Sequence, residues 1–385
     1  MLSGAGAGAA ARCFVPASRI IKVEAFGNGL INSSWVIHCK QWSAQKIFLQ
    51  RMNRHVFSNP EQIIENIQQL HAHIKSLPAP KPNARVLRFP DLITTRDGSG
   101  FFIDDEGEYW RAFQFLEQTQ TLETVQTTHQ AREIGYVLGR FHSLLSDIDL
   151  DRLKTTLADF HVTPNYLHCF DLAYKQSQLA QQTDEFRQCL VYIERFRNDA
   201  HHLEQARQSN HLPTRLIHGD PKRDNILFDQ NTEYAVSLID LDTMQPGLIH
   251  YDIGDCLRSC CGTVVNPEQA FSSMTFNLDI FETILQSYLE HTRKIIRPIE
   301  YNWFYDAILL IPFELGLRFL TDYLNGNVYF KTTHPRQNLE KALQQFTLAA
   351  DIEANKTAIQ TTIQRLKQQL TDANQVAAKS HSDSH

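Results

Sequence analysis

The sequence has no CxxC pair among its seven cysteines, and no apolar run long enough to cross a bilayer. Its most apolar stretch, residues 307–313, is short and contains a proline. An odd number of cysteines in a chain of 385 residues argues against a disulfide framework and indicates a reducing compartment. Cys256, Cys260 and Cys261 could be proposed as metal ligands, but their spacing fits no common zinc motif, and we interpret them as buried thiols.

The sequence also lacks a basic excess, because its formal net charge is −6 and its pI is about 6.3. This charge gives no electrostatic footprint for nucleic acid. The first residues lack the basic start and strongly apolar run of a secretory signal. We therefore expect a cytoplasmic monomer or dimer without nucleic-acid or membrane partners. We expect disordered tails at residues 1–20 and, where the chain becomes polar and small, at residues 371–385.

The first third of the chain has the period-2 patterns of strands. Segments 34–39 and 45–51 flank a short polar turn, as in a hairpin. A helix is predicted after the S-x-x-E pattern that begins at Ser58, and further strands are expected at 86–93, 101–104 and 109–116. Residues 21–116 thus predict a small antiparallel β lobe with one inserted helix.

From about residue 129 the apolar period changes to that of a helix. Helical stretches are expected at 165–207, 266–293, 300–325 and 337–370, and short strands near 215–218, 225–228 and 235–240 lie between them. The predicted fold is therefore α+β with two lobes, in which a larger, mainly helical lobe spans residues 117–370. A cleft between such lobes is a common place for a ligand site.

The most informative segment joins two short strands and reads His218-Gly219-Asp220, followed by Asn225 and, at the end of a later strand, Asp240. Phosphoryl transfer needs a carboxylate that orients the attacking hydroxyl, and oxygen ligands for Mg²⁺. Protein kinases separate their base Asp and metal-binding Asn by five positions, as Asp220 and Asn225 are separated. Lys222 is well placed to meet the transferring phosphoryl group.

Other interpretations of this segment remain open. An Asp–Asn pair in a loop often only makes a turn, and we interpret Asp224 as a solvated loop charge. His218 could carry a proton, although ordering of the loop is the preferred interpretation. A di-metal hydrolase would need more histidine ligands nearby, and His250 is the available one.

The pattern HGDxKxxN followed by IDLDT resembles the aminoglycoside phosphotransferase/choline kinase superfamily, which has a protein-kinase-like fold. The sequence resembles N-acetylhexosamine 1-kinases more specifically, over residues 24–350. That resemblance rests on segments 27–32, 48–53, 56–57, 59–60, 65–67, 110–111, 246–247, 251–258, 318–323 and 329–331.

The resemblance implies ATP and Mg²⁺ as cofactors and assigns roles to individual residues. Asp220 would be the catalytic base, and Asn225 and Asp240 the metal ligands. The loop over the phosphates would be Gly27-Asn28-Gly29, and the hinge that meets adenine would lie between Phe113 and Glu117, with Phe115 inside it. The residues near the acceptor would be Asp255, Arg258, Arg318 and Tyr329.

One position departs from the kinase pattern. Many kinases carry a lysine on the third strand that pairs with the nucleotide phosphates. Strand alternation puts the neutral Gln50 in that register, whereas Arg51 faces the other way. Either Arg51 reaches around, or Lys222 and Mg²⁺ carry more of the charge. A lysine–glutamate pair that would use Glu65 is therefore in doubt.

The function predicted from the sequence is an ATP-dependent kinase that phosphorylates the anomeric hydroxyl of an N-acetylhexosamine. The mixture of acidic and basic residues at the candidate acceptor site suits a neutral polyol better than a polycation. The alternatives are another hydroxyl acceptor (homoserine, a choline-like amino alcohol or an aminoglycoside) and a nucleotide-binding pseudoenzyme. The sequence does not distinguish GlcNAc from GalNAc.

Overall fold

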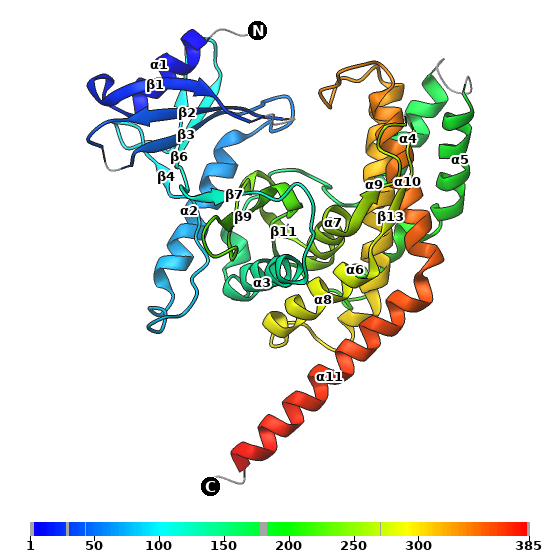
Figure 1. The fold of residues 1–385 in the computed structure, drawn as a ribbon. Coiled ribbons are helices and arrows are strands. Elements are labelled where there is room, and N and C mark those ends of the chain that lie inside the picture. The colour runs from blue at the N-terminus through cyan, green and yellow to red at the C-terminus, as the bar shows by residue number, and fades with distance from the viewer. Residues whose placement is uncertain (1–3, 28–30, 43, 178–182, 270, 383–385) are drawn as a thin grey trace.

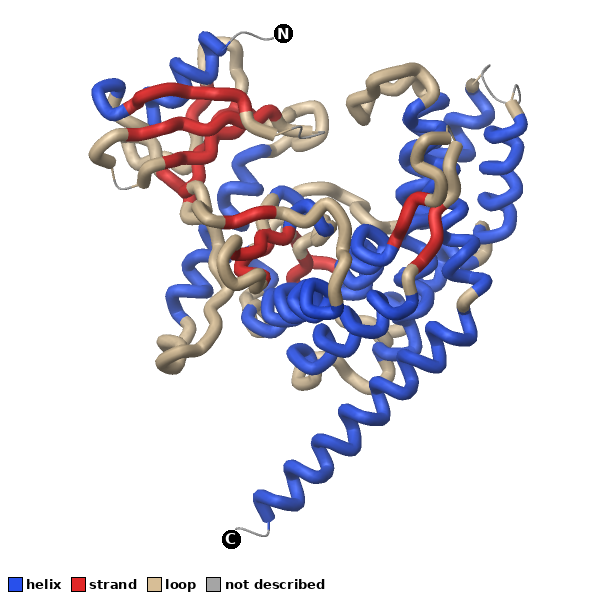
Figure 2. Tube along the Cα trace, in the orientation of Figure 1, coloured by secondary structure: helices blue, strands red, loops and turns tan. Residues whose placement is uncertain are grey.

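The structure is a computed structural model that describes residues 4–27, 31–42, 44–177, 183–269 and 271–382. A β-rich N-terminal part stands beside a larger helical part, and Figure 1 shows the chain passing from one to the other near β7. Figure 2 shows the longer strands gathered in the N-terminal part and only short strands within the helical part. This arrangement confirms the predicted α+β, kinase-like architecture.

The N-terminal sheet has the strand order β1-β2-β3-β6-β4, and β5 also pairs with β6. Each of these pairings is antiparallel. The strands span Ile20–Ala25, Ser33–Cys39, Lys46–Arg51, Leu92–Ile93, Phe102–Ile103 and Tyr109–Gln114 for β1 to β6. The strand expected at 86–93 is shortened to β4, because the N–H of Arg88 bonds the carbonyl of Val236 in the helical part instead of a sheet neighbour.

Residues 4–14 form the helix α1 (Gly4–Phe14) instead of the expected disordered tail. Ala7, Ala10, Ala11 and Phe14 are buried at helical spacing, and they pack against sheet residues that include Trp110. Alanine has the highest intrinsic helix propensity. The short side chains also let the helix lie close on the sheet, which is why a segment that looked merely small and flexible is ordered.

The helix α2 (Pro60–Ser76) connects the two parts. It begins at Pro60, within the predicted S-x-x-E pattern, but the preceding Asn59 makes no side-chain capping bond. The buried amide of Asn66 donates to the carbonyls of Lys154 and Met244, and so fixes α2 to the larger part.

Short strands in the helical part hold the predicted motif segment. They are β7 (Thr119–Gln120), β8 (Arg215–Ile217), β9 (Ile226–Asp229), β10 (Ala235–Leu238) and β11 (Gln245–Gly247). Strand β9 lies between β10 and β7, and β8 pairs with β11. The chain therefore joins the C-terminal part as soon as it leaves β6.

Helices form the rest of the larger part, and several are shorter than predicted. Segment 165–207 is divided into α4, α5 and α6. Segment 266–293 contains β13, the second strand of the β12–β13 hairpin, before α8. The bounds are Thr128–Leu144 for α3, Thr163–Gln176 for α4, Asp184–Phe196 for α5, His202–Gln208 for α6, Ile249–Cys261 for α7, Gly262–Val264 for β12, Met274–Phe276 for β13, Leu278–Thr292 for α8, Phe304–Leu324 for α9 and Gln337–Ala354 for α10.

The last helix, α11, runs from Lys356 to Ser382 and projects from the body of the molecule (Figure 1). The predicted disordered tail at 371–385 is therefore helical up to Ser382. The predicted helix at 337–370 instead divides into α10 and α11. Among the helices described, none combines the length and apolarity that a membrane span requires.

Candidate active site

The loop after β8 carries His218, Gly219 and Asp220, and it depends on glycine at its centre. Gly219 has a φ of +84°, a conformation that residues with a Cβ adopt at a cost. A Cβ at this position would lie 2.6 Å from the carbonyl oxygen of Thr243. The loop thus packs directly on the segment after Asp240, which brings the two halves of the motif together.

His218 orders this loop. Its buried ring donates from Nε2 to the carbonyl of Ile239 at 3.1 Å, and Nδ1 accepts from the N–H of Asp220 at 3.3 Å. Burial lowers the pKa of His218 below its usual value. A neutral ring that is bonded on both nitrogens fits the preferred interpretation of a structural residue and not that of a proton carrier.

Asp252, on α7, anchors the same loop through its carboxylate. Its two carboxylate oxygens accept the backbone N–H groups of His218 at 2.7 Å and Gly219 at 2.8 Å. The ring of His142 contacts Asp252 at 2.8 Å and is itself held by Tyr288. Burial by itself would raise the pKa of Asp252. The hydrogen bonds and charges of its partners more than offset this effect, so its pKa lies below the usual value. The carboxylate therefore stays ionised and fixes the backbone just before Asp220.

His161 supports the loop from the other side. Its Nε2 lies 2.7 Å from the carbonyl oxygen of Gly219, and its Nδ1 lies 2.9 Å from the carboxylate of Glu314. Because an ionised carboxylate and a carbonyl can only accept, both ring nitrogens donate and the ring is an imidazolium. Burial lowers the pKa of His161, yet Glu314 outweighs it and the pKa is raised.

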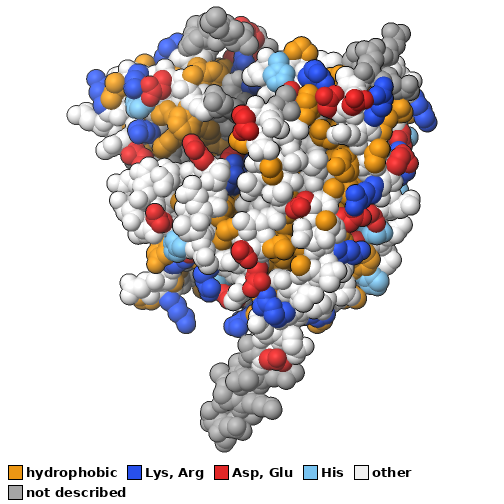
Figure 3. All heavy atoms as spheres, turned by 45° about the vertical axis from the view of Figure 1, so that its right-hand side comes forward, with side chains coloured by type: hydrophobic (Ala, Val, Ile, Leu, Met, Phe, Trp, Pro, Cys, Tyr) orange, Lys and Arg blue, Asp and Glu red, His pale blue; other side chains and the backbone are white. Residues whose placement is uncertain are grey.

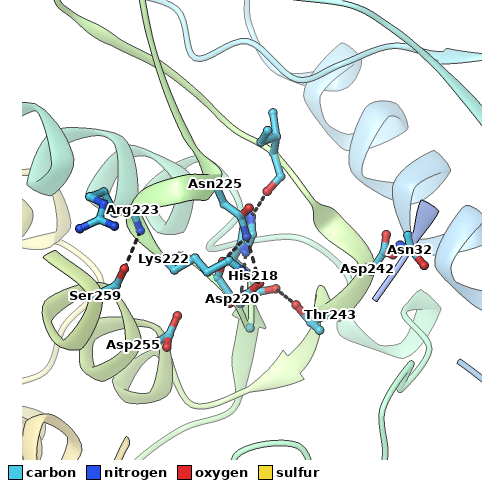
Figure 4. Close-up of polar contacts among 12 residues, drawn as sticks. Asn32, His218, Asp220, Lys222, Arg223, Asn225, Asp242, Thr243, Asp255 and Ser259 are labelled. Atoms are coloured by element: carbon cyan, nitrogen blue, oxygen red, sulfur yellow. Dashed lines mark hydrogen bonds and ion pairs between the residues drawn. The ribbon is translucent and has the colours of Figure 1, made fainter. Parts of the chain in front are cut away.

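Asp220, Lys222 and Asn225 converge at the end of the loop (Figure 4). Lys222 forms an ion pair with Oδ2 of Asp220. Asn225 donates its amide N–H groups to that oxygen at 3.0 Å and to the backbone carbonyl of Asp220 at 2.8 Å. Burial opposes the charge of Lys222, but Asp220 and Asp240 more than compensate and raise its pKa. The predicted base thus lies partly exposed beside a cation.

Asp240 follows β10 in the left-handed conformation, with a φ of 66°. It keeps an exposed surface. The surrounding protein nevertheless removes part of its solvation and, with the charge of Asp242, raises the pKa of Asp240. Such a carboxylate is stabilised by a cation.

Asp240 and Asn225 fit a magnesium site of a particular kind. The described part of the chain contains no group of three or more His, Cys, Asp or Glu side chains that could hold a metal. Mg²⁺ commonly keeps several waters and uses one or two protein oxygens together with substrate phosphates. One carboxylate and one amide oxygen suit that arrangement and do not suit a di-metal hydrolase.

Gln50 and Arg51 lie on opposite faces of β3, as the alternation predicted. Gln50 pairs across the sheet with Arg111 and accepts from it at 2.7 and 3.1 Å. Arg51 is opposite Trp110 and stacks on its ring, with 5.9 Å to the centroid. Trp110 belongs to the face covered by α1, so Arg51 does not reach around. Glu65 is exposed on α2 and is not the partner of Gln50.

The residues predicted to surround the nucleotide are only partly described. Gly27 has a φ of +69°, consistent with a tight turn, whereas Asn28 and Gly29 lie outside the described residues. Phe113 is nearly buried at the end of β6, and Glu117 is exposed in the crossing to β7. Phe115 contacts Phe26 with ring centroids 5.6 Å apart, so the crossing segment packs beside the start of the predicted phosphate loop.

Asp255 and Arg258 lie one turn apart on α7 and form an ion pair. Arg258 donates from Nε and Nη2 to Oδ1 of Asp255 at 3.0 and 2.8 Å. Oδ2 of Asp255 is buried and has no hydrogen-bond partner among the described residues. Figure 4 shows Asp255 beside Lys222, the residue that pairs with the predicted base.

Arg318, on α9, is surrounded by aromatic rings. Its guanidinium carbon lies 5.3 to 6.0 Å from the ring centroids of Phe160, Tyr166, Phe330 and Tyr329. The two acids that lie one helical turn from Arg318 on α9 are engaged elsewhere. Glu314 contacts His161 and Thr163, and Asp322 accepts three backbone N–H groups of residues 328–330. Arg318 and Tyr329 therefore do meet, as predicted.

Sequence reasoning missed the residues that hold the site together. Asp252, His161, Asp242, Asn32 and Arg111 carry no local signal that separates them from ordinary polar residues. All of them except His161 lay inside the segments that carry the family resemblance, but nothing in those segments indicated which partner each would have. The one available hint was a charged residue, Arg111, within a predicted strand. The cysteines gave no site: Cys256, Cys260 and Cys261 are free and buried, as interpreted.

Comparisons with known proteins identify a family and a shared fold. Residues 22–272 match the model of the phosphotransferase enzyme family. A choline kinase from Cryptosporidium parvum Iowa II shares 15% identity and a TM-score of 0.60 over 96% of this chain and 100% of its own. A microcompartment-associated aminopropanol kinase shares 14% identity and a TM-score of 0.61, over 92% of this chain and 98% of that one. An aminoglycoside 2′-phosphotransferase solved with GDP shares 12% identity and a TM-score of 0.61, with coverages of 93% and 100%.

These identities are low, so the solved structures show a shared fold. The family match covers well over half of the chain, from within β1 to beyond the end of α7. Asp220, Asn225 and Asp240 all lie within it. The chain belongs to the phosphotransferase enzyme family.

Proposed function

We propose that this phosphotransferase uses ATP to phosphorylate the anomeric hydroxyl of an N-acetylhexosamine, giving the sugar 1-phosphate. Support comes from the convergence of Asp220, Lys222 and Asn225 at one loop, and from the resemblance of the sequence to N-acetylhexosamine 1-kinases. Kinases of the same fold have been solved in complex with GDP, ADP and AMP-PNP. We therefore propose that the phosphoryl donor is a nucleoside triphosphate. We also propose that the enzyme acts in carbohydrate metabolism in the cytoplasm.

The observation that carries the choice of acceptor is the state of the charges at the acceptor residues. A cationic acceptor is bound by unpaired acids or by open aromatic faces. Here Asp255 is already paired with Arg258, and the aromatic faces around Arg318 are already occupied by its guanidinium. We therefore favour a neutral polyol, whose hydroxyls would hydrogen-bond Arg318, Tyr329 and the unpartnered oxygen of Asp255.

The proposed reaction needs few protein groups. The hydroxyl oxygen of the acceptor attacks the γ-phosphorus, its bond to phosphorus forms, and the bond from phosphorus to the bridging oxygen of ADP breaks. Asp220 orients the hydroxyl and receives its proton. Lys222 would meet the charge on the phosphoryl oxygens, because positioning and electrostatics supply most of the catalysis in such transfers. Bound Mg²⁺, held by Asn225 and Asp240, would supply further charge neutralisation.

The test is incubation of the purified protein with ATP, Mg²⁺ and a panel of acceptors. The panel contains GlcNAc, GalNAc, homoserine, choline, ethanolamine and an aminoglycoside, and the Asp220→Asn variant is the control for contaminating kinases. Phosphate at C1 of an N-acetylhexosamine, seen by NMR and mass spectrometry, supports the proposal. Turnover of an amine acceptor with none of the sugars contradicts the acceptor. Nucleotide binding without transfer to any acceptor favours a pseudoenzyme.

A further inference from the structure

Asp242 lies two residues after the predicted metal ligand Asp240. Each of its carboxylate oxygens contacts the N-terminal part, one in an ion pair and the other as a hydrogen-bond acceptor. Arg111 of β6 pairs with Oδ1 at 2.5 Å, and Asn32, just before β2, donates to Oδ2 at 2.7 Å. Figure 4 shows Asp242 turned toward Asn32 and to one side of the cluster around Asp220. We call Arg111, Asn32 and Asp242 the clasp.

The two N-terminal members of the clasp are themselves held by their neighbours. The side-chain oxygen Oδ1 of Asn32 accepts the backbone N–H of Asn53 at 2.9 Å. Arg111 donates from Nε and Nη2 to Oε1 of Gln50, whose own amide nitrogen contacts Ser34 at 3.3 Å. The clasp is therefore fixed to β2 and β3 on one side and to the segment that carries Asp240 on the other.

This network explains why glutamine replaces the expected lysine. A lysine at position 50 has no acceptor atom and would place a second cation beside Arg111. Glutamine offers the oxygen that Arg111 needs. The cation that faces Asp242 is thus Arg111 of β6, and not a side chain at position 50 of β3.

We propose that the clasp is the positioning device that holds Asp240 for the metal–nucleotide complex, with Arg111 acting through Asp242 and not by contact with phosphate. This inference rests on the nucleotide-binding part of the proposed function and is independent of the acceptor. Asn32 lies immediately before β2, so one carboxylate links the start of that strand, β6 and the metal-ligand segment. Arg111 and Asp242 are 1% and 3% exposed, so the ion pair is shielded from solvent.

Burial makes the clasp sensitive to the loss of either partner. Removing one member of a buried ion pair leaves an uncompensated charge, whereas removing both can be far less harmful. Groups that orient a metal ligand typically change metal affinity about 10–100-fold when they are replaced. The effect should therefore appear in binding of the metal–nucleotide complex, and it should be strongly non-additive.

The experiment measures binding of ADP by calorimetry with Mg²⁺ and with EDTA, for Arg111→Met, Asp242→Asn and the double variant. Each single change should raise the Kd of Mg·ADP about 10–100-fold. The Kd of Mg·ADP for the double variant should be no higher than that of the single variant that binds more weakly. The Kd of metal-free ADP should change much less in every variant. Melting temperatures of the same preparations identify any variant that fails to fold. In that case Arg111→Lys and Asp242→Glu, which keep the charges but alter the geometry, replace it.

The matched control is Arg51→Met, because Arg51 is the neighbouring cation of β3 on the opposite face. It should leave the Kd of Mg·ADP unchanged. If Arg111→Met weakens binding while Asp242→Asn leaves it unchanged or tightens it, Arg111 contacts the phosphates itself and the clasp is wrong. Unchanged Mg·ADP binding in both folded single variants also overturns it. A protein that binds Mg·ADP normally but transfers phosphate to no sugar would contradict the proposed acceptor and not the clasp.

Discussion

The ring of His161 donates to the carbonyl oxygen of Gly219 at 2.7 Å, directly before the predicted base Asp220. His161 comes from the loop that precedes α4, more than fifty residues away in the sequence. Its second nitrogen is held by Glu314 of α9. The position of the base thus depends on an imidazolium supplied by a distant segment, and this makes the loop sensitive to pH.

We expect the stability supplied by His161 to fall as the pH rises. Its pKa in the folded protein is raised above the unfolded value of about 6.5. A raised pKa means that the contribution is complete below about pH 6.5 and is lost as the pH rises through the folded pKa. Glu314 and Asp255 are the anions that act on this ring. Thermal unfolding from pH 6 to pH 9 should show a decline that is smaller in His161→Gln. Parallel pH curves for both proteins would contradict this role.

Asp220→Asn should leave folding and Mg·ATP binding intact and lower kcat about 10²–10⁴-fold. The replacement is nearly isosteric, but an amide cannot accept the acceptor's proton. Steady-state kinetics and a nucleotide Kd on one preparation check this prediction. The exposed loop residue Asp224 provides the control, because Asp224→Asn should have near-normal kcat. Near-normal turnover by a folded Asp220→Asn would remove Asp220 from the role of base.

Asp240→Asn should weaken nucleotide binding in the presence of Mg²⁺ as well as lowering the rate. A neutral amide is a poorer Mg²⁺ ligand than a carboxylate. Titration of Mg²⁺ at fixed ADP should shift the midpoint to higher metal concentration, whereas binding of ADP in EDTA should change little. A midpoint equal to that of the wild type would show that Asp240 is not a ligand.

Arg318→Ala should raise the KM for the sugar and leave the KM for ATP close to that of the wild type. A site that hydrogen-bonds hydroxyls loses strongly when its partner is removed, because buried polar groups are left unpaired. Arg336→Ala is the matched control. Arg336 also stacks on an aromatic ring, that of Phe271, and it pairs with Glu185.

A merely structural Arg318 would give a different result from the same measurements. The variant would then lose thermal stability, while the surviving folded enzyme would keep the sugar KM of the wild type. Measuring the melting temperature and both KM values on one preparation separates the two outcomes.

The sequence by itself determined the architecture and the reactive loop. Strand alternation, the change of period near residue 129 and the spacing of Asp220 and Asn225 are local properties, so they could be read without coordinates. The opposite facing of Gln50 and Arg51 followed from the same alternation and was confirmed. The alanine spacing of α1 was also present in the sequence, but it becomes informative only when a sheet lies opposite.

The tertiary structure alone decided which residues hold the site in place. Asp242 and Arg111 are separated by more than one hundred positions, as are Asp252 and His142, and no sequence period relates such partners. Their pairing follows from the way in which the two parts of the chain pack, because a buried charge must find its partner wherever the fold provides one. The sequence therefore showed that position 50 lacks the expected lysine. The packing of β6 against the segment after Asp240 showed that Arg111 is the cation that pairs with Asp242.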